Sequence, residues 1–495
     1  MSAANKILFA TSEAAPLIKT GGLGDVSGSL PVALKALRKD VRMVLPAYRE
    51  VVAKVKPLNV VGVLDLGLPH SVRILEGQFP NSKIPLLLID APSHFDRAGN
   101  PYVDAAGKDW ADNAERFAVY SKVIERIALD DVGLNWRPNV VHCNDWQTGL
   151  AAALLARHHE RPTTAFTVHN LAYQGNFPAS TFRALQALLK LPSELFRYDA
   201  MEFHGQFSFI KGGLAFADRI NTVSPTYAKE IRTPEFGCGL DGLLNFRAGD
   251  LEGILNGADY AIWNPAQDTM IAQTYDAEHL EQKYVNKHAL QQQMGLPIER
   301  DTPLIGMVGR LVEQKGVSLV LQALPDLASR FEFQLVVLGS GDLALEQAFR
   351  RMAALHPTRI AVRTGFSEPM AHLIEAGSDM FLMPSLFEPC GLNQMYSLRY
   401  GTVPIVRHTG GLADTVRDTT AGSLRDGTAN GISFVECTEK ALADAIGRAL
   451  GLYEQKAVWR ALMARAMADN YSWERSARSY LQLYAKAAKN RAKKG

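Results

Sequence analysis

A glycine-rich segment near the start of the chain carries residue types suited to binding a phosphorylated ligand. It reads Lys-Thr-Gly-Gly-Leu-Gly-Asp over residues 19–25, between a strand predicted at 6–10 and a helix predicted at 25–37. Glycine lets a backbone pass close to a ligand, and the first turn of a helix presents unpaired N–H groups to an anion. Lys19 adds a positive charge there. A tight turn that binds nothing is the alternative interpretation.

A dinucleotide-binding loop is a second alternative, because Gly22, Gly24 and Gly28 crudely resemble its spacing. Such a loop also requires an acidic residue at the end of the second strand, where it holds a ribose hydroxyl. The strand predicted at 41–45 ends instead in Pro-Ala-Tyr-Arg. The sequence therefore disfavours a dehydrogenase.

Two cations follow a predicted strand in the second half of the chain. Arg310 and Lys315 come after the strand at 304–308, and Gly316 follows them. A guanidinium fork and an ammonium point charge together suit a pyrophosphate. Solvated side chains at the start of a helix are the alternative.

Other polar or glycine-rich turns also lie at the ends of predicted strands. They are Glu388-Pro-Cys-Gly-Leu after the strand at 380–383, Thr-Gly-Gly-Leu at 409–412 after 404–406, and Gly-Ser-Gly-Asp at 339–342 after 334–338. A carboxylate at such a turn can accept hydrogen bonds from sugar hydroxyls. The alternative is that it only stabilises the positive end of a helix dipole. Repetition of these turns across two predicted sheets favours a nucleotide-type ligand.

One histidine occupies a comparable position in the first half. His169 follows the strand at 164–168 and precedes Asn170, so it could reach a reaction centre. A hydrogen-bonded structural histidine is the alternative interpretation.

Composition limits the class of protein. The chain has 495 residues, 47% hydrophobic residues, 21% charged residues and a formal net charge of +2. These values are typical of a globular protein with two or three domains, and they indicate neither a nucleic-acid binder nor a membrane protein. Four cysteines without metal-ligand spacing, and too short an apolar start for a signal peptide, predict a cytoplasmic enzyme.

Alternating strand and helix patterns predict an α/β fold with two doubly wound domains facing each other across a deep cleft. In the first half, strands are predicted at 6–10, 41–45, 84–89, 140–143, 164–168, 219–223 and 253–255. In the second they are predicted at 304–308, 334–338, 360–363, 380–383, 404–406 and 432–435. The predicted domains are 1–258 and 259–470, with a hinge near 260, a terminal helix at 471–495 and a mobile loop at 91–115.

Metal ligands are not evident in the sequence. It contains no Asp-x-Asp motif and no His/Asp cluster at metal-ligand spacing. If a diphosphate leaves during a reaction, Arg310, Lys315 and helix N-termini must stabilise its charge instead.

The combination of Lys-Thr-Gly-Gly-Leu-Gly-Asp at 19–25, Glu-Pro-Cys-Gly-Leu at 388–392 and Thr-Gly-Gly-Leu at 409–412 resembles bacterial glycogen synthases and plant starch synthases. The resemblance covers essentially the whole chain. It implies a retaining glucosyltransferase of the GT-B type, which moves glucose from ADP-glucose to the non-reducing 4-hydroxyl of an α-1,4-glucan. It further implies no metal, no pyridoxal phosphate, and a terminal helix that packs back on the N-terminal domain.

The resemblance also implies a donor site. Arg310 and Lys315 are similar to the pair that binds the diphosphate, and Glu388 to the carboxylate that contacts the glucose hydroxyls. His169 is similar to the residue beside the glucose 6-hydroxyl. The other implied donor contacts are Lys19, Gly21, Gly22, Asn256, Phe366, Cys390, Gly391, Leu392, Thr409 and Gly410. Phe366 stands where some members have a tyrosine that stacks on the base, which leaves the preference for ADP over UDP open.

On the acceptor side, the resemblance implies roles for Asp25 and Asp145, and Tyr102 in the loop 91–115 is a candidate glucan contact. Three other functions stay open at this point: a UDP-glucose-dependent transferase, a phosphorylase with bound pyridoxal phosphate, and a non-catalytic glucan-binding protein. Closure of the expected cleft would exclude water from an activated glucosyl group.

Overall fold

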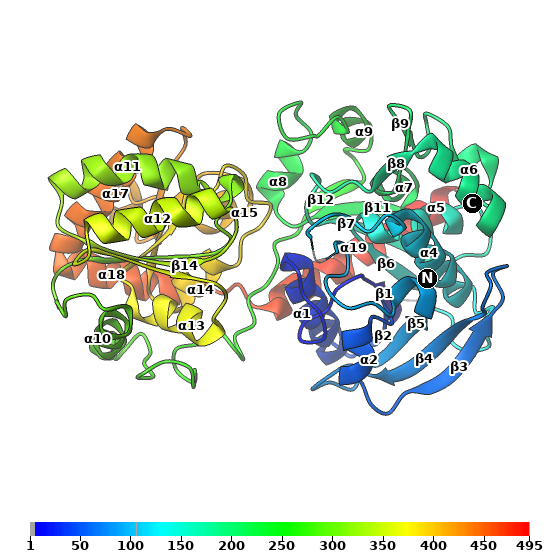
Figure 1. Cartoon of the computed structure of the whole chain (residues 1–495), viewed down its shortest axis with the longest axis horizontal. Coiled ribbons are helices and arrows are strands. Elements are labelled where there is room, and N and C mark those ends of the chain that lie inside the picture. Colours follow the sequence, from blue (N-terminus) through cyan, green and yellow to red (C-terminus); the bar gives the residue numbers. More distant parts are fainter. Residues whose placement is uncertain (1–4, 105, 495) are drawn as a thin grey trace. The chain divides into compact units, whose positions relative to one another are not determined.

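The computed structural model describes residues 5–104 and 106–494 and divides the chain into two compact units (Figure 1). The N-terminal unit runs up to Gly257 and includes the segment from Trp473 onward. The C-terminal unit is Ala258–Ser472. Each unit contains its own large, mainly parallel sheet, as the alternating pattern predicts.

The sheet of the N-terminal unit has the order β12-β11-β7-β6-β1-β2-β5-β4-β3. Its strands are β1 (Lys6–Ala10), β2 (Asp40–Pro46), β3 (Asn59–Leu64), β4 (Val72–Gln78), β5 (Pro85–Asp90), β6 (Val140–Asn144), β7 (Thr163–Val168), β11 (Arg219–Thr222) and β12 (Leu251–Gly253). The pairs β3–β4 and β4–β5 are antiparallel, and the others are parallel. The sequence interpretation missed β3, the edge strand, in which Val60 and Val63 are exposed, and it missed β4, which pairs with β3.

The strands of this sheet are connected largely by helices. These are α1 (Gly22–Ala36), α2 (Arg49–Lys54), α3 (Pro92–Phe95), α4 (Asn113–Ala128), α5 (Trp146–Leu155), α6 (Ala179–Leu189), α7 (Phe209–Phe216), α8 (Pro225–Glu230), α9 (Asp241–Phe246) and a 3₁₀ turn, Ser193–Leu195. A small sheet of β8 (Asn176–Pro178), β10 (Gln206–Ser208) and β9 (Glu202–Phe203) is added to them. In α1, Val26, Leu30 and Leu34 recur at helical spacing and are buried.

The last helix, α19 (Trp473–Lys494), belongs to the N-terminal unit, where it packs against α1, β7 and β11. A buried polar chain attaches it to the sheet. Tyr484 donates to Nδ1 of His142 (2.8 Å), and Nε2 of His142 donates to Thr167 (2.6 Å). The Thr167 hydroxyl donates its one hydrogen to Asn221 (2.7 Å). It must therefore accept from Nε2 of His142, and Nδ1 of the neutral ring must accept from Tyr484.

The segment 91–115 has more internal structure than the predicted mobile loop. It contains α3 and the start of α4, and an isolated bridge joins Val103 to Asp109. Arg97 pairs with Asp112, and the buried guanidinium of Arg116 donates to the carbonyl of Pro101 (2.8 Å). These polar contacts hold the segment in place.

The C-terminal unit has a six-stranded parallel sheet in the order β15-β14-β13-β16-β17-β18. Its strands are β13 (Leu304–Val308), β14 (Gln334–Gly339), β15 (Ile360–Thr364), β16 (Met380–Met383), β17 (Val403–Arg407) and β18 (Ile432–Phe434). Its helices are α10 (Lys283–Met294), α11 (Val317–Arg330), α12 (Leu343–Leu355), α13 (Glu368–Gly377), α14 (Asn393–Arg399), α15 (Gly410–Thr415), α16 (Ala421–Arg425), α17 (Glu439–Glu454) and α18 (Lys456–Met467), with 3₁₀ turns at Leu280–Gln282 and Glu313–Lys315.

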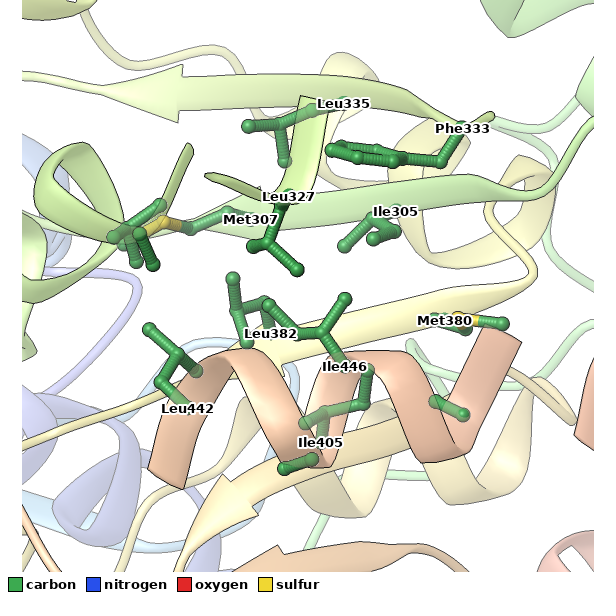
Figure 2. Packing of buried hydrophobic residues seen from close by; sticks show 14 of the residues in the cluster. Ile305, Met307, Leu327, Phe333, Leu335, Met380, Leu382, Ile405, Leu442 and Ile446 are labelled. Carbon is green, nitrogen blue, oxygen red and sulfur yellow. The ribbon is translucent and has the colours of Figure 1, made fainter. Parts of the chain in front are cut away.

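Both faces of this sheet are covered, because successive strand residues point to opposite sides. On one face, Ile305 and Met307 pack with Leu327 of α11 and with Leu442 and Ile446 of α17 (Figure 2). On the other face, Leu304, Val336 and Phe381 pack against α10 and α13. Burial on both faces explains the continuous Val, Ile and Leu runs from which the strands were predicted.

The chain passes from the first unit to the second between Gly257 and Ala258, close to the hinge predicted near 260. Trp263, a few residues on, is inserted between the rings of His372 (3.8 Å between centroids) and Tyr396 (4.1 Å). His372 also contacts Asp268 through Nδ1 (2.7 Å). The segment that follows the crossing is therefore packed firmly into the C-terminal unit.

Candidate active site

The strand order of the C-terminal sheet reverses between β13 and β16, and ligands of such sheets bind beyond the carboxyl ends of the strands at this point. A pocket of about 190 Å³ lies there. Its lining includes Gly309, Arg310, Lys315, Ser385, Glu388, Gly391, Leu392 and Asn393. The fold thus brings together the cation pair after β13 and the carboxylate turn after β16, which are far apart in the sequence.

The charged centre of this pocket is an ion pair. Nζ of Lys315 lies 2.5 Å from Oε2 of Glu388, and the same oxygen accepts a hydrogen bond from Ser385 (3.0 Å). The Glu388 side chain is 9% exposed and that of Lys315 is 25% exposed. A carboxylate held in this way has a fixed orientation, and the ammonium stays accessible from the pocket.

Arg310 lies at the rim of the pocket with an exposed side chain, and one of its nitrogens is 3.4 Å from the Gln314 side-chain oxygen. The backbone on either side of the cation pair is held against other strands. Gly309 donates to the Leu338 carbonyl (3.0 Å), and a Cβ on Gly316 would lie 2.1 Å from the Pro384 carbonyl oxygen. Glycine at 316 therefore allows the close approach that places Lys315 beside the turn after β16.

The turn at 388–392 leads directly into α14. Cys390 is buried, Gly391 has a φ of +73°, and the amide of Gln394 donates to both of their carbonyls (3.0 Å each). The side chain of Asn393 donates to the Val308 carbonyl at the end of β13 (2.9 Å). The turn and the first residue of α14 thus line the pocket through Gly391, Leu392 and Asn393.

The Thr-Gly-Gly-Leu segment supports this turn. A Cβ on Gly410 would lie 1.9 Å from the Glu388 carbonyl oxygen, and one on Gly411 would lie 2.0 Å from the Cys390 carbonyl oxygen. The Gly411 N–H donates to the Glu388 carbonyl (3.1 Å). Close backbone packing explains both glycines, and the contact of Thr409 and Gly410 with a distal phosphate stays a prediction.

Phe366 follows β15 at the same carboxyl edge of the sheet. Its side chain is 86% exposed, an unusual state for a large aromatic residue. Gly365 beside it has a φ of +104° and donates to the Gly339 carbonyl (3.1 Å). The ring is available for stacking on a planar ligand.

In the N-terminal unit, the strand order reverses between β1 and β6, and the glycine-rich segment follows β1. A residue that the sequence interpretation missed, Glu13, holds this segment in place. Its buried carboxylate accepts from the N–H (2.5 Å) and hydroxyl (2.6 Å) of Thr20, from the N–H of Gly21 (3.2 Å) and from the hydroxyl of Tyr102 (2.7 Å). Glu13 lies three residues after the end of β1 and outside the glycine-rich segment, so only its contacts reveal its role.

This arrangement changes the expected role of the glycine-rich segment. The N–H of Gly21, predicted to face a donor, is directed at Glu13 in this structure. Lys19 is half-exposed and pairs with Asp25 in the first turn of α1 (2.7 Å). Gly22 has open space around the position of a Cβ. Lys19 and Gly22 thus remain accessible to a ligand.

His169 and Asp145 lie at the carboxyl ends of β7 and β6, which are adjacent strands. The Asp145 carboxylate accepts from the backbone N–H of His169 (2.7 Å). Burial lowers the pKa of His169 to about 3, so its imidazole is neutral at physiological pH. Burial also raises the pKa of Asp145 to about 7, against the opposing effect of the backbone hydrogen bond.

Asp145 has a φ of +55°, a conformation that costs energy in a residue other than glycine. It directly precedes α5, so its backbone turns from strand to helix at this residue. Strained residues of this kind are frequent at functional sites, where the surrounding contacts hold them.

Two predicted contacts of the N-terminal unit have different surroundings. Asn256 is buried, and its Oδ1 has no hydrogen-bond partner among the described residues. The hydroxyl of Tyr102, predicted to face a glucan, contacts Ser12 (2.7 Å) and Glu13. The Tyr102 hydroxyl therefore supports the loop in this structure, and a glucan contact would have to use the rest of its ring.

Two further observations concern the part of the chain that the structure describes. Among residues 5–104 and 106–494, no three His, Cys, Asp or Glu side chains are grouped so that they could hold a metal ion. None of the helices in these residues has the length and apolar character that a membrane crossing requires.

Two family models match the chain. Residues 6–246 match the starch synthase catalytic domain, and residues 291–461 match glycosyl transferases group 1. The fold is also that of a sucrose-phosphate synthase from Thermosynechococcus elongatus (17% identity, TM-score 0.58). The two Rossmann-like units and the pocket at the strand-order reversal therefore define a glycosyltransferase with the GT-B fold.

Similar proteins narrow this class. Glycogen synthase from Thioalkalivibrio sulfidiphilus is 56% identical over 97% of this chain and 99% of its own length. Glycogen synthase 1 from Methylococcus capsulatus is 54% identical over 97% of this chain and 96% of its own. The catalytic domain of starch synthase IV from Arabidopsis thaliana, bound to ADP and acarbose, has a TM-score of 0.86 at 33% identity over 98% of this chain and 100% of its own. The chain belongs to the glycogen synthase and starch synthase family.

Proposed function

We propose that this protein transfers glucose from ADP-glucose to the non-reducing 4-hydroxyl of an α-1,4-glucan, with retention at the anomeric carbon. The observation that carries the proposal is the pocket of the C-terminal unit, where two cations, an oriented carboxylate and helix N–H groups meet at the strand-order reversal. These are the groups that a sugar attached to a diphosphate requires. Membership of the glycogen synthase family supports the glucan acceptor.

In this proposal the diphosphate of the donor binds Arg310, Lys315 and the N–H groups at Gly391 and Leu392. Lys315 would then contact a phosphate oxygen as well as Glu388, which keeps its own place through Ser385. Glu388 accepts hydrogen bonds from glucose hydroxyls. Phe366 stacks on the base, and the starch synthase structure with ADP supports an adenine nucleotide.

The N-terminal unit contributes Lys19, Asp25, Asp145, His169 and Asn256. The neutral imidazole of His169 orients a glucose hydroxyl without adding a charge beside the developing oxocarbenium ion. Oδ1 of Asn256, which has no partner among the described residues, can accept a hydrogen bond from a sugar hydroxyl. Asp25 and Asp145 lie on the side of the acceptor.

The reaction that we propose needs no protein nucleophile. The bond between the anomeric carbon and the phosphate oxygen breaks, and the acceptor hydroxyl attacks on the same face. Its proton passes to the leaving phosphate, whose charge Arg310 and Lys315 stabilise. Since two protein cations take this role, we expect no requirement for a divalent metal or another cofactor. We also propose a cytoplasmic location, since no disulfide joins the four cysteines, all of which the structure describes.

The test is glucose incorporation into glycogen by the purified protein, with ADP-glucose and UDP-glucose compared side by side. Both donors are also run with a chelator. We expect a strong preference for ADP-glucose, α-configured product and a rate that the chelator does not change. Preference for UDP-glucose would contradict the donor, and incorporation from neither donor would contradict the enzymatic function. Strict dependence on a divalent metal would contradict the role of the two cations.

A further inference from the structure

The structure identifies a residue that sets the chemical form of His169. The side chain of Asn144, the last residue of β6, lies against the imidazole, with Oδ1 3.0 Å from Nε2 of His169. Asn144 is fully buried and His169 is 8% exposed. One of these two atoms carries the hydrogen of the contact, and the other accepts it.

The backbone around Asn144 shows that the imidazole carries it. Nδ2 of Asn144 donates to the carbonyl of Ala10 in β1 (2.9 Å) and lies 3.4 Å from the carbonyl of His142. Carbonyl oxygens only accept hydrogen bonds, so the amide nitrogen must face them. Oδ1 is then the atom that faces His169, and Nε2 of the neutral imidazole must be the donor. Nδ1 is left as the nitrogen with a lone pair.

We propose that Asn144 is a positioning residue that locks His169 in the Nε2–H form, so that Nδ1 is the acceptor for a substrate hydroxyl. This inference rests on the proposed function, in which His169 meets a sugar hydroxyl. The lock is built from three parallel strands, β1, β6 and β7, through the carbonyl of Ala10, the amide of Asn144 and the ring of His169. Ala10 and Asn144 are the last residues of their strands and His169 directly follows β7, so the sheet holds all three close together.

The ionisable groups near His169 are consistent with a neutral ring. His142 lies on β6, Asp145 begins the turn into α5 and accepts from the His169 backbone, and Glu13 after β1 acts on Asp145. The hydroxyl of Tyr227 in α8 accepts a hydrogen bond from the N–H of Leu171. Among the described residues, no carboxylate forms a hydrogen bond or ion pair with the ring of His169.

Three variants separate the lock from a merely structural role. Asn144→Leu removes the acceptor and the tautomer preference with it. Asn144→Asp places a carboxylate against Nε2, which favours the imidazolium and moves its titration toward the assay range. Thr148→Val is the matched control: it removes the buried hydrogen bonds to the backbone carbonyls of Asn144 (2.9 Å) and Asp145 (3.1 Å) and leaves the Asn144 side chain unchanged.

The direct readout is the tautomer itself, measured by two-bond ¹H–¹⁵N correlation spectra of the full-length protein labelled with ¹⁵N only in histidine. His169→Gln assigns the signals among the 12 histidines. We expect wild type and Thr148→Val to show Nε2–H with unprotonated Nδ1 between pH 6 and 8, and Asn144→Leu to show mixed tautomers. An Nδ1–H form in the wild type would overturn the inference, whether or not the protein transfers glucose.

Kinetics supply a second readout. We expect Asn144→Leu to lower kcat by on the order of 10- to 100-fold with a smaller change in the donor KM, because misplacement of a reacting contact acts on the transition state. The raised pKa of Asp145, about 7, gives wild type and Thr148→Val a pH dependence of their own, and Asn144→Asp should add the titration of His169 to it between pH 6 and 8. Unchanged kcat and pH profile in both Asn144 variants would overturn the role of the lock. A wild type without transferase activity would instead overturn the proposed function.

Discussion

At the scale of single residues, the candidate site consists of charged groups that hold one another in place before any ligand arrives. Glu388 is oriented by Lys315 and Ser385, and Glu13 by four donors around the glycine-rich segment. Groups fixed in this way lose little freedom when substrate binds, which favours electrostatic stabilisation of a transition state.

Glu13 provides a test at this scale. Glu13→Ala removes the acceptor for the N–H groups of Thr20 and Gly21, so the segment that carries Lys19 loses its anchor. We expect kcat to fall by on the order of 10- to 100-fold, because a contact with the reacting sugar is misplaced. The exposed Glu50 provides the control, Glu50→Ala. Equal kinetics for the two variants, measured with the donor at saturation, would contradict the anchoring role.

At the scale of elements, the site depends on backbone segments that approach one another too closely for a side chain. The Thr-Gly-Gly-Leu segment and the turn at 388–392 are the clearest pair, since they meet through carbonyl oxygens and glycine Cα atoms. The sequence indicated that these glycines matter, but it assigned them to phosphate binding. Their packing partner is distant in sequence, so no local pattern reveals it.

Gly411→Ala tests this packing. Its Cβ would lie 2.0 Å from the Cys390 carbonyl oxygen, so the turn must move. We expect a loss of about 1–3 kcal/mol in unfolding free energy and a reduced kcat, since overpacking shifts the backbone. In Gly422→Ala the nearest atom to the new Cβ is the Thr420 hydroxyl oxygen at 3.7 Å. This control should retain its unfolding free energy and its kcat. Chemical denaturation and initial rates check both variants, and a neutral Gly411→Ala would refute the packing argument.

At the scale of the whole molecule, the sequence predicted the central parallel strands well and the strands at the edge of the N-terminal sheet poorly. The strands β13 and β16 have the predicted ends, because their apolar runs are buried on both faces of the sheet. The β3–β4 hairpin was missed, and β12 lies at 251–253 where 253–255 was predicted, because edge strands have weaker patterns. The predicted site residues were found through motifs at strand ends and the family resemblance, whereas the roles of Glu13, Asn144 and Ser385 follow only from their contacts.

The attachment of α19 gives a prediction for the pH dependence of stability. Burial lowers the pKa of His142 to about 3, well below the value of about 6.5 in an unfolded chain. The folded pKa is the lower one, so the stabilisation is fully present above pH 6.5 and is lost as the pH falls toward 3. We expect wild type to lose about 1.4 kcal/mol per pH unit relative to His142→Phe between pH 6 and 4. The comparison cancels the opposite effect of Asp145, whose pKa is raised.

Urea denaturation of both proteins at each pH measures this difference. Tyr484→Phe, which removes the donor to His142 while keeping the histidine, should destabilise the protein at neutral pH by about 1–3 kcal/mol. A difference between wild type and His142→Phe that does not vary with pH would show that His142 is not held neutral in the folded protein.

The central claim is that the pocket at the strand-order reversal of the C-terminal unit stabilises the leaving diphosphate. The most direct measurement is the steady-state kinetics of Lys315→Ala with ADP-glucose, beside Arg330→Ala as a control that removes an exposed cation of α11 from the same unit. We expect kcat to fall by about 10²-fold or more in Lys315→Ala and to stay unchanged in the control. An increase confined to KM would show that Lys315 binds ground and transition states equally, and would contradict the claim.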